Sequence, residues 1–150
     1  LNRHSFDDIA SHWHECYERL RPSISLHHDS LQALEALRAL GSRQMILSAL
    51  PQSVLQSAVQ NFGVGHFFEH VTGVSDAHGT SKIAEGHYLL SKVNAPASEV
   101  TVIGDSSHDA EVARALASNC ILVARGAESR ARLEEHGYPV VDSFSDLIGG

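Results

Sequence analysis

The segment from residue 100 to residue 117 reads Val100-Thr-Val-Ile-Gly-Asp-Ser-Ser-His-Asp-Ala-Glu-Val-Ala-Arg-Ala-Leu-Ala117. Its first four residues are apolar or β-branched, a pattern typical of a strand buried on both faces. Gly104 and Asp105 end this strand. Ser106, followed by Asp109 three residues later, is the pattern of a helix N-terminus. The segment therefore predicts a strand, a tight turn and a helix, with Asp105 at the carboxyl end of the strand, where open α/β sheets bind their ligands.

The two carboxylates of this segment admit two interpretations. Asp109 can be the acidic member of a capping box, with Asp105 a simple turn former. Alternatively, both hold Mg²⁺, a hard cation that takes oxygen ligands. Such an ion typically binds one or two protein carboxylates and leaves its other positions to water and phosphate. The segment by itself leaves both interpretations open.

Apolar runs alternate with helical patterns on both sides of this segment. Further strands are predicted at residues 45–48, 70–74, 120–123 and 138–141, and helices at residues 5–20, 29–40, 51–62, 81–93 and 128–136. Strands that alternate with helices predict an α/β fold, in which helices cover both faces of a parallel sheet.

Two more side chains stand where these elements begin or end. Ser48 ends the strand at residues 45–48, so it is expected at the same rim of the sheet as Asp105 if the two strands are parallel. Lys82 falls in the first turn of the helix at residues 81–93, where the helix dipole favours an anion. A phosphate or a carboxylate at that position would receive both the ammonium and the helix amides. An ordinary turn serine and a solvated lysine remain the alternatives.

Composition narrows the class of protein. A chain of 150 residues with 43% hydrophobic residues suits one soluble core. The 18 acidic and 11 basic residues give a net charge of -7, which argues against nucleic-acid binding. The sequence contains no long apolar run and no signal-peptide pattern, so neither a membrane span nor export is indicated and a cytoplasmic protein is expected. Cys120 is expected to be a buried thiol.

In this order, Ile46-Leu-Ser48, then Ser81-Lys82, then Gly104-Asp-x-x-x-Asp109 resemble the motifs of the haloacid dehalogenase (HAD) superfamily. Within it, the chain is most similar to the phosphoglycolate-phosphatase-like hydrolases, over about residues 31–150. The resemblance implies a Rossmannoid HAD-like core at residues 41–150 and the remnant of a helical cap, with its connecting helix, at residues 1–40.

The resemblance also implies the chemistry. In such enzymes the hydroxyl binds the transferring phosphoryl group, the lysine neutralises charge, and the last acidic pair secures Mg²⁺. By this resemblance, Ser48 and Lys82 are the expected catalytic and phosphate-binding residues. Asp105 and Asp109 are the expected metal ligands. The implied substrate is a small phosphorylated metabolite. A dehalogenase is disfavoured, since halide displacement needs no divalent cation.

The first motif of the family, an apolar strand ending in Asp-x-Asp-Gly-[Thr/Ser], is absent from the sequence. It supplies the nucleophilic aspartate and lies between the strands of Ser48 and Asp105 in the family's sheet. A gap is therefore expected there, to be filled by a rearranged strand, a partner chain or a segment outside this sequence. The open edges also leave room for a homodimer or strand exchange. This chain by itself is expected to be inactive. A non-catalytic phosphate- or partner-binding module of the same fold is the alternative.

Overall fold

The computed structural model describes residues 12, 15, 16, 19, 23–74, 81–126 and 128–149. The helix predicted at residues 5–20 lies largely outside the described residues. The strands are β1 (Met45–Pro51), β2 (His70–Val74), β3 (Thr101–Gly104), β4 (Asn119–Val123) and β5 (Val140–Val141). The α-helices are α2 (Ser30–Ala39), α3 (Gln52–Asn61), α4 (Ser81–Val93), α5 (Ser107–Leu116) and α6 (Arg130–Glu134). Short 3₁₀ helices are η2 (Gly65–Phe67), η3 (Ala97–Glu99) and η4 (Phe144–Leu147).

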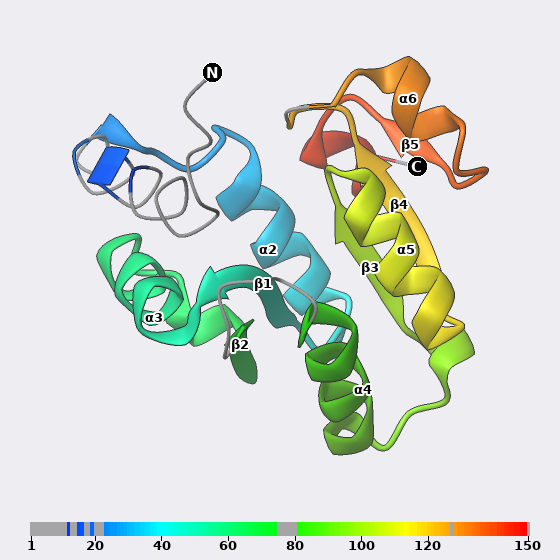
Figure 1. Cartoon of the computed structure of the whole chain (residues 1–150), viewed down its shortest axis with the longest axis horizontal. Coiled ribbons are helices and arrows are strands. Elements are labelled where there is room, and N and C mark those ends of the chain that lie inside the picture. The colour runs from blue at the N-terminus through cyan, green and yellow to red at the C-terminus, as the bar shows by residue number, and fades with distance from the viewer. Residues whose placement is uncertain are drawn as a thin grey trace, which may run out of the picture.

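The strands form two separate parallel sheets. One contains β1 and β2, and the other contains β3, β4 and β5 in that order. Figure 1 shows the two sheets as distinct pieces, with α2 drawn between them. Among the described residues, β1 is paired only with β2 and β3 only with β4. The expected break between the strand of Ser48 and the strand of Asp105 is therefore confirmed, as is the parallel α/β fold.

Helices connect the two sheets where strands do not. Helix α4 packs against β1 and β2 of the first sheet and against α5, which covers the second. Its Gly86 permits this approach, because a Cβ at that position would lie 3.3 Å from Leu47 of β1 and 3.0 Å from Leu116 of α5. Helix α2 contacts both η2 and η4. The two sheets are thus joined through α2 and α4.

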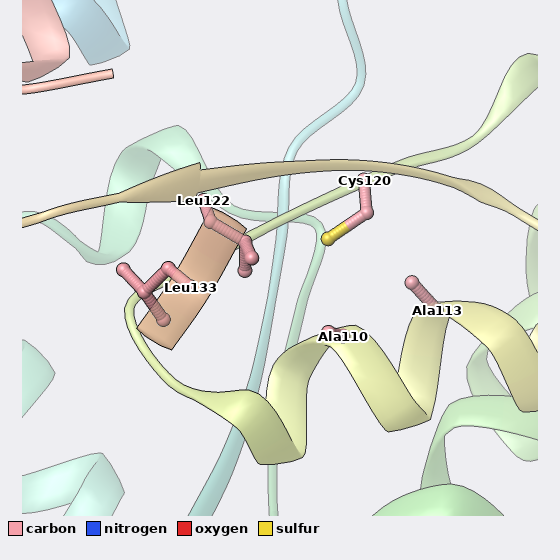
Figure 2. Close-up of a cluster of buried hydrophobic side chains, with 5 residues drawn as sticks. All are labelled: Ala110, Ala113, Cys120, Leu122 and Leu133. Atoms are coloured by element: carbon pink, nitrogen blue, oxygen red, sulfur yellow. The ribbon is translucent and has the colours of Figure 1, made fainter. Parts of the chain in front are cut away.

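The core of the three-stranded sheet lies between β4 and α5. Figure 2 shows the side chains of this cluster, Ala110, Ala113, Cys120, Leu122 and Leu133. The two alanines are completely buried and have small side chains, so α5 packs close to β4. A second cluster of Leu55, Val59, Val64 and Phe67 lies beneath the two-stranded sheet.

Strand β3 departs from its predicted burial. The prediction of a strand buried on both faces is wrong, because Thr101 and Ile103 are exposed and Val102 and Gly104 are only half-buried. Ile103 retains 40% of its accessible surface, whereas Leu122 of β4 retains none. The reason is topological: among the residues that the structure describes, β4 has a strand on each side, and β3 has a strand on one side only.

Strand β1 is longer than predicted, because its end is supported by a side chain. The regular register of β1 with β2 breaks between Leu47 and Pro51. Beyond the break, the Gln52 side chain donates to the Val71 carbonyl at 2.9 Å and accepts from the Gly73 amide at 2.6 Å. The Gln52 side chain thus makes two hydrogen bonds with β2 of the kind that the backbone of a paired strand would make.

Among the described helices, none is long and apolar enough to cross a membrane.

Candidate functional site

Lys82 and Asp109 form a buried ion pair at the start of two helices. Lys82 Nζ donates to Asp109 Oδ1 at 2.6 Å, and the residues are 9% and 7% exposed. Lys82 belongs to the first turn of α4, where an ammonium opposes the helix dipole. The carboxylate of Asp109 offsets this charge. The pair also joins the β2–α4 part of the chain to the β3–α5 part.

The second carboxylate oxygen of Asp109 organises the turn after β3. Oδ2 accepts from the amides of Asp105 and Ser106, both at 3.1 Å, and from the Ser106 hydroxyl at 2.7 Å. With the Ser106 hydroxyl accepting from the Asp109 amide, this is the capping box predicted from the sequence. Gly104 is required beside it, because a Cβ there would collide with the Asp109 side chain.

Burial by itself raises the pKa of the Asp109 carboxyl, but the hydrogen bond from Lys82 and its positive charge outweigh this effect. Hydrogen bonds from Ser106 and from the Asp105 amide act in the same direction. The pKa of Asp109 is therefore lowered from its usual value of 3.8. The carboxylate is held in its charged form, and both of its oxygens accept hydrogen bonds from within the chain.

Asp105 differs from Asp109 in being exposed. It follows β3 directly, and its carboxylate lies against the backbone of Gly126, where a Cβ would collide with it. None of the hydrogen bonds found among the described residues uses the Asp105 carboxylate. An exposed, unshared carboxylate at the carboxyl end of a parallel strand fits the hard-oxygen chemistry of Mg²⁺.

Ser48 belongs to the two-stranded sheet, whereas Asp105 follows a strand of the three-stranded sheet. Ser48 lies on β1, at the first residue beyond the regular pairing with β2. Its Oγ accepts from the Leu50 amide at 3.1 Å, so the hydroxyl proton remains available to an acceptor. Within the described residues, Ser48 forms no hydrogen bond with Lys82, Asp105 or Asp109.

The structure thus brings Lys82, Asp105 and Asp109 together and leaves Ser48 on the neighbouring sheet. No group of three or more His, Cys, Asp or Glu side chains able to hold a metal ion occurs in the part of the chain that the structure describes. Asp105 and Asp109 are two acids of suitable type. Any further ligand would have to be water, phosphate or a residue outside this group.

Comparison with known proteins decides the family. The family model described as haloacid dehalogenase-like hydrolase matches residues 2–123, most of the chain. The chain belongs to this family. The resemblance to this family, predicted from the order of Ser48, Lys82 and the Gly-Asp-x-x-x-Asp segment, is therefore confirmed.

The chain is similar to curated phosphoglycolate phosphatases. It is 24% identical to that of Colwellia psychrerythraea strain 34H over 99% of this chain and 65% of the relative. It is 25% identical to that of Pseudomonas syringae pv. syringae strain B728a over 79% of this chain and 44% of the relative. The chain therefore spans between about half and two thirds of the length of these relatives.

Solved structures show the same fold. The chain matches a predicted phosphoglycolate phosphatase from Haemophilus somnus 129pt with a TM-score of 0.81 at 20% identity, covering 99% of this chain and 68% of that one. A haloacid dehalogenase-like hydrolase from Streptococcus pneumoniae matches with a TM-score of 0.79 at 20% identity, covering 98% of this chain and 71% of that one.

The sequence-based prediction missed part of the surroundings of Asp105. Glu128 accepts from the Ser107 amide at 2.9 Å and from the Ser107 hydroxyl, although 21 residues separate the two. The loop between β4 and α6 therefore reaches the start of α5. Glu128 is the first residue of the helix predicted at residues 128–136, whereas α6 begins at Arg130, and its position in the sequence gives no sign of this contact.

Proposed function

We propose that this chain is the greater part of a Mg²⁺-dependent phosphatase that hydrolyses a small phosphorylated metabolite through an aspartyl-phosphate. The observation that carries the proposal is the buried Lys82–Asp109 pair beside the exposed carboxylate of Asp105. A buried ion pair is not a common device for stability alone, because the desolvation of both charges opposes it. An ammonium fixed next to an open carboxylate suits the binding of a phosphate and its cation.

The roles of the residues follow from the charge of a phosphoryl group in transfer. Negative charge spreads over its equatorial oxygens, so catalysis depends on positioning and on nearby positive charge. Lys82 is held in place by Asp109 and supplies a positive charge that does not need to be ordered during the reaction. Ser48 has a free hydroxyl proton to donate to a phosphoryl oxygen.

In the proposed site, Asp105 and Asp109 are the acidic pair for Mg²⁺, which when bound neutralises phosphate charge and orients the substrate. Asp105 is the residue whose carboxylate is open to an ion. Asp109 contributes its charge and fixes both the Lys82 ammonium and the Asp105 main chain. These two carboxylates match the small number that Mg²⁺ takes from a protein.

The nucleophile is proposed to come from a strand outside these 150 residues. The described strands β1 and β3 each have one unpaired side, and the sequence lacks an apolar strand that ends in Asp-x-Asp-Gly. Unpaired backbone groups favour an added strand, which would bring its terminal aspartate to the same rim as Asp105. Such a strand, placed between β1 and β3, would make the two sheets one and put Ser48 and Asp105 at the same rim.

The test adds a segment that contains an apolar strand ending in Asp-x-Asp-Gly-Thr upstream of Leu1. The extended protein should release inorganic phosphate from small phosphate esters, 2-phosphoglycolate among them, in the presence of Mg²⁺. EDTA should abolish the activity, and Asp105→Asn should lower it by at least about 100-fold, the upper end for residues that merely support a metal ligand. The matched control carries Asn in place of the first aspartate of the added segment. Activity that persists in EDTA would refute the proposal.

A non-catalytic phosphate- or partner-binding module is the second candidate. The observation that favours it is that both oxygens of the Asp109 carboxylate already accept hydrogen bonds from within the chain. The two functions separate in the same experiment. A module of this kind would bind inorganic phosphate in a Lys82-dependent manner but remain inactive after the strand is added.

A further inference from the structure

A hydrogen-bonded group that the proposed function does not use lies at the start of α5. Glu128 Oε1 accepts from the Ser107 amide at 2.9 Å, and Oε2 accepts from the Ser107 hydroxyl. His136 Nε2 lies 2.8 Å from the same hydroxyl oxygen. Because the hydroxyl proton is directed to Glu128, the histidine nitrogen is the donor in this arrangement. Glu128 thus accepts one of the free amides at the N-terminus of α5, beside the capping box of Ser106.

The Ser107 hydrogen bonds lower the pKa of the Glu128 carboxyl and favour its charged form. Arg132 adds a weaker attraction, with its Nε 3.6 Å from Glu128 Oε2. Three-quarters of the Glu128 side chain is buried, whereas Arg132 is largely exposed. The principal partner of Glu128 is therefore Ser107 and not Arg132 of the following helix α6.

The loop that carries Glu128 also touches Asp105. Gly126, two residues earlier, lies so close that a Cβ would collide with the Asp105 carboxylate. On the other side of Gly126, Arg125 donates to Asp29 Oδ1 and to the Asp142 carbonyl, both at 2.8 Å. The backbone against which Asp105 rests is thus fixed by Arg125 before Gly126 and by Glu128 after it.

We propose that Glu128 is a positioning residue for Asp105, acting through Ser107 and through the backbone of Gly126. The inference rests on the proposed function, because it assigns Glu128 a part in orienting a metal-binding carboxylate. The hydrogen bonds of Glu128 tie the first residue of α5, two residues after Asp105, to the loop on which the Asp105 carboxylate rests. Residues that orient metal ligands from behind commonly affect metal affinity by about 10- to 100-fold.

The test measures Mn²⁺ affinity by titration calorimetry on the full 150-residue chain. Glu128→Gln should weaken Mn²⁺ binding by about 10-fold or more. Ser107→Ala keeps every charge and removes only the hydroxyl, so a loss of similar size would come from geometry. Glu134→Gln is the matched control: it removes one negative charge from the same part of the chain, where its partner is Arg130. The control should bind Mn²⁺ as the wild type does.

A second measurement, made without metal, separates this inference from the proposed function. In ¹⁵N spectra, Glu128→Gln and Ser107→Ala should both shift the amide signals of Gly126 and Asp105, and Glu134→Gln should leave them in place. If the wild type binds no Mn²⁺, or Asp105→Asn binds it equally well, the proposed metal site fails while the spectra still decide the role of Glu128. If both variants bind Mn²⁺ like the control, or leave both amide signals unchanged, the positioning role is refuted.

Discussion

At the scale of single residues, the Lys82–Asp109 pair is a buried ion pair that joins the starts of α4 and α5. Both groups are almost fully removed from water, which costs free energy that the 2.6 Å contact and the turn hydrogen bonds must offset. The loss of one partner would leave the other charge buried and unpaired. Such a loss is more damaging than removal of both charges together.

Lys82→Met should lower the free energy of unfolding by about 3 to 5 kcal/mol, since it leaves Asp109 charged in a buried position. The double variant Lys82→Met with Asp109→Asn should recover part of this loss, because no buried charge remains. Urea unfolding followed by circular dichroism measures both. Lys92→Met, an exposed position on the same helix, is the control. A Lys82 variant as stable as the Lys92 variant would contradict the prediction.

The pKa of Asp109 also predicts how stability depends on pH. Its folded pKa lies below 3.8, so its contribution is fully present above that pH and is lost as the pH falls through the folded value. The wild type should therefore lose stability in acid below about pH 4 more steeply than Asp109→Asn. Unfolding free energies measured between pH 6 and the acid limit would test this, and parallel curves would count against it.

Cys120 should be chemically inert in the folded protein. Burial, together with the charge of Asp109, raises the pKa of its thiol to about 11. At pH 8 about one thiol in a thousand would be ionised, and only the thiolate reacts readily. In a Cys16→Ser variant, iodoacetamide should label Cys120 slowly in buffer and rapidly in urea. Equal rates under both conditions would show that the thiol is accessible in the folded state.

At the scale of elements, α2 is attached to the three-stranded sheet through Asp29, which precedes it. Asp29 is 2% exposed, and its oxygens receive Arg125 Nη1 at 2.8 Å and the Ser145 amide at 3.2 Å. Burial raises the pKa of the Asp29 carboxyl, but the Ser145 hydrogen bond and the Arg125 charge outweigh it, so that the pKa is lowered overall. The Asp29–Arg125 contact joins residues that lie 96 positions apart in the sequence.

Asp29→Asn should detach the start of α2 and lower the urea midpoint, because Arg125 loses its charged partner. Since the pKa of Asp29 is lowered, the stabilisation is present above pH 3.8 and disappears as the pH falls through the folded value. The difference between the variant and the wild type should therefore shrink in strong acid. Asp142→Asn, which removes an exposed carboxylate from the same region, is the control. A constant difference at all pH values would contradict the prediction.

The elements themselves were largely predictable. The turn at Gly104 and the capping box of Ser106 and Asp109 depend on hydrogen bonds between residues close together in the chain, so a short sequence pattern predicts them. The contacts of Asp29 with Arg125 and of Ser107 with Glu128 join residues that are far apart in the sequence, so no local sequence pattern predicts them. Strand β1 continues past Ser48 for a similar reason, because Gln52 hydrogen-bonds to β2.

At the scale of the whole molecule, the divided sheet predicts uneven protection of the backbone. Strands β1 and β3 each have a pairing partner on one side, so alternate amides on each lack a strand acceptor among the described residues. Hydrogen exchange followed by NMR should find these amides less protected than those of β4, which is paired on both sides. Uniform protection that increases with protein concentration would instead show that a second copy fills the gap.

The sequence by itself determined the order of strands and helices, the capped turn at Asp105, and membership of the haloacid dehalogenase-like family. These features depend on short-range patterns of apolar spacing, capping and small residues. Only the tertiary structure decided that Lys82 pairs with Asp109, that Asp105 rests on Gly126, and that β3 is partly exposed. Each of these depends on which segments the fold brings side by side. Burial and hydrogen bonding between segments far apart in the sequence produce no periodic pattern of residues from which they could be predicted.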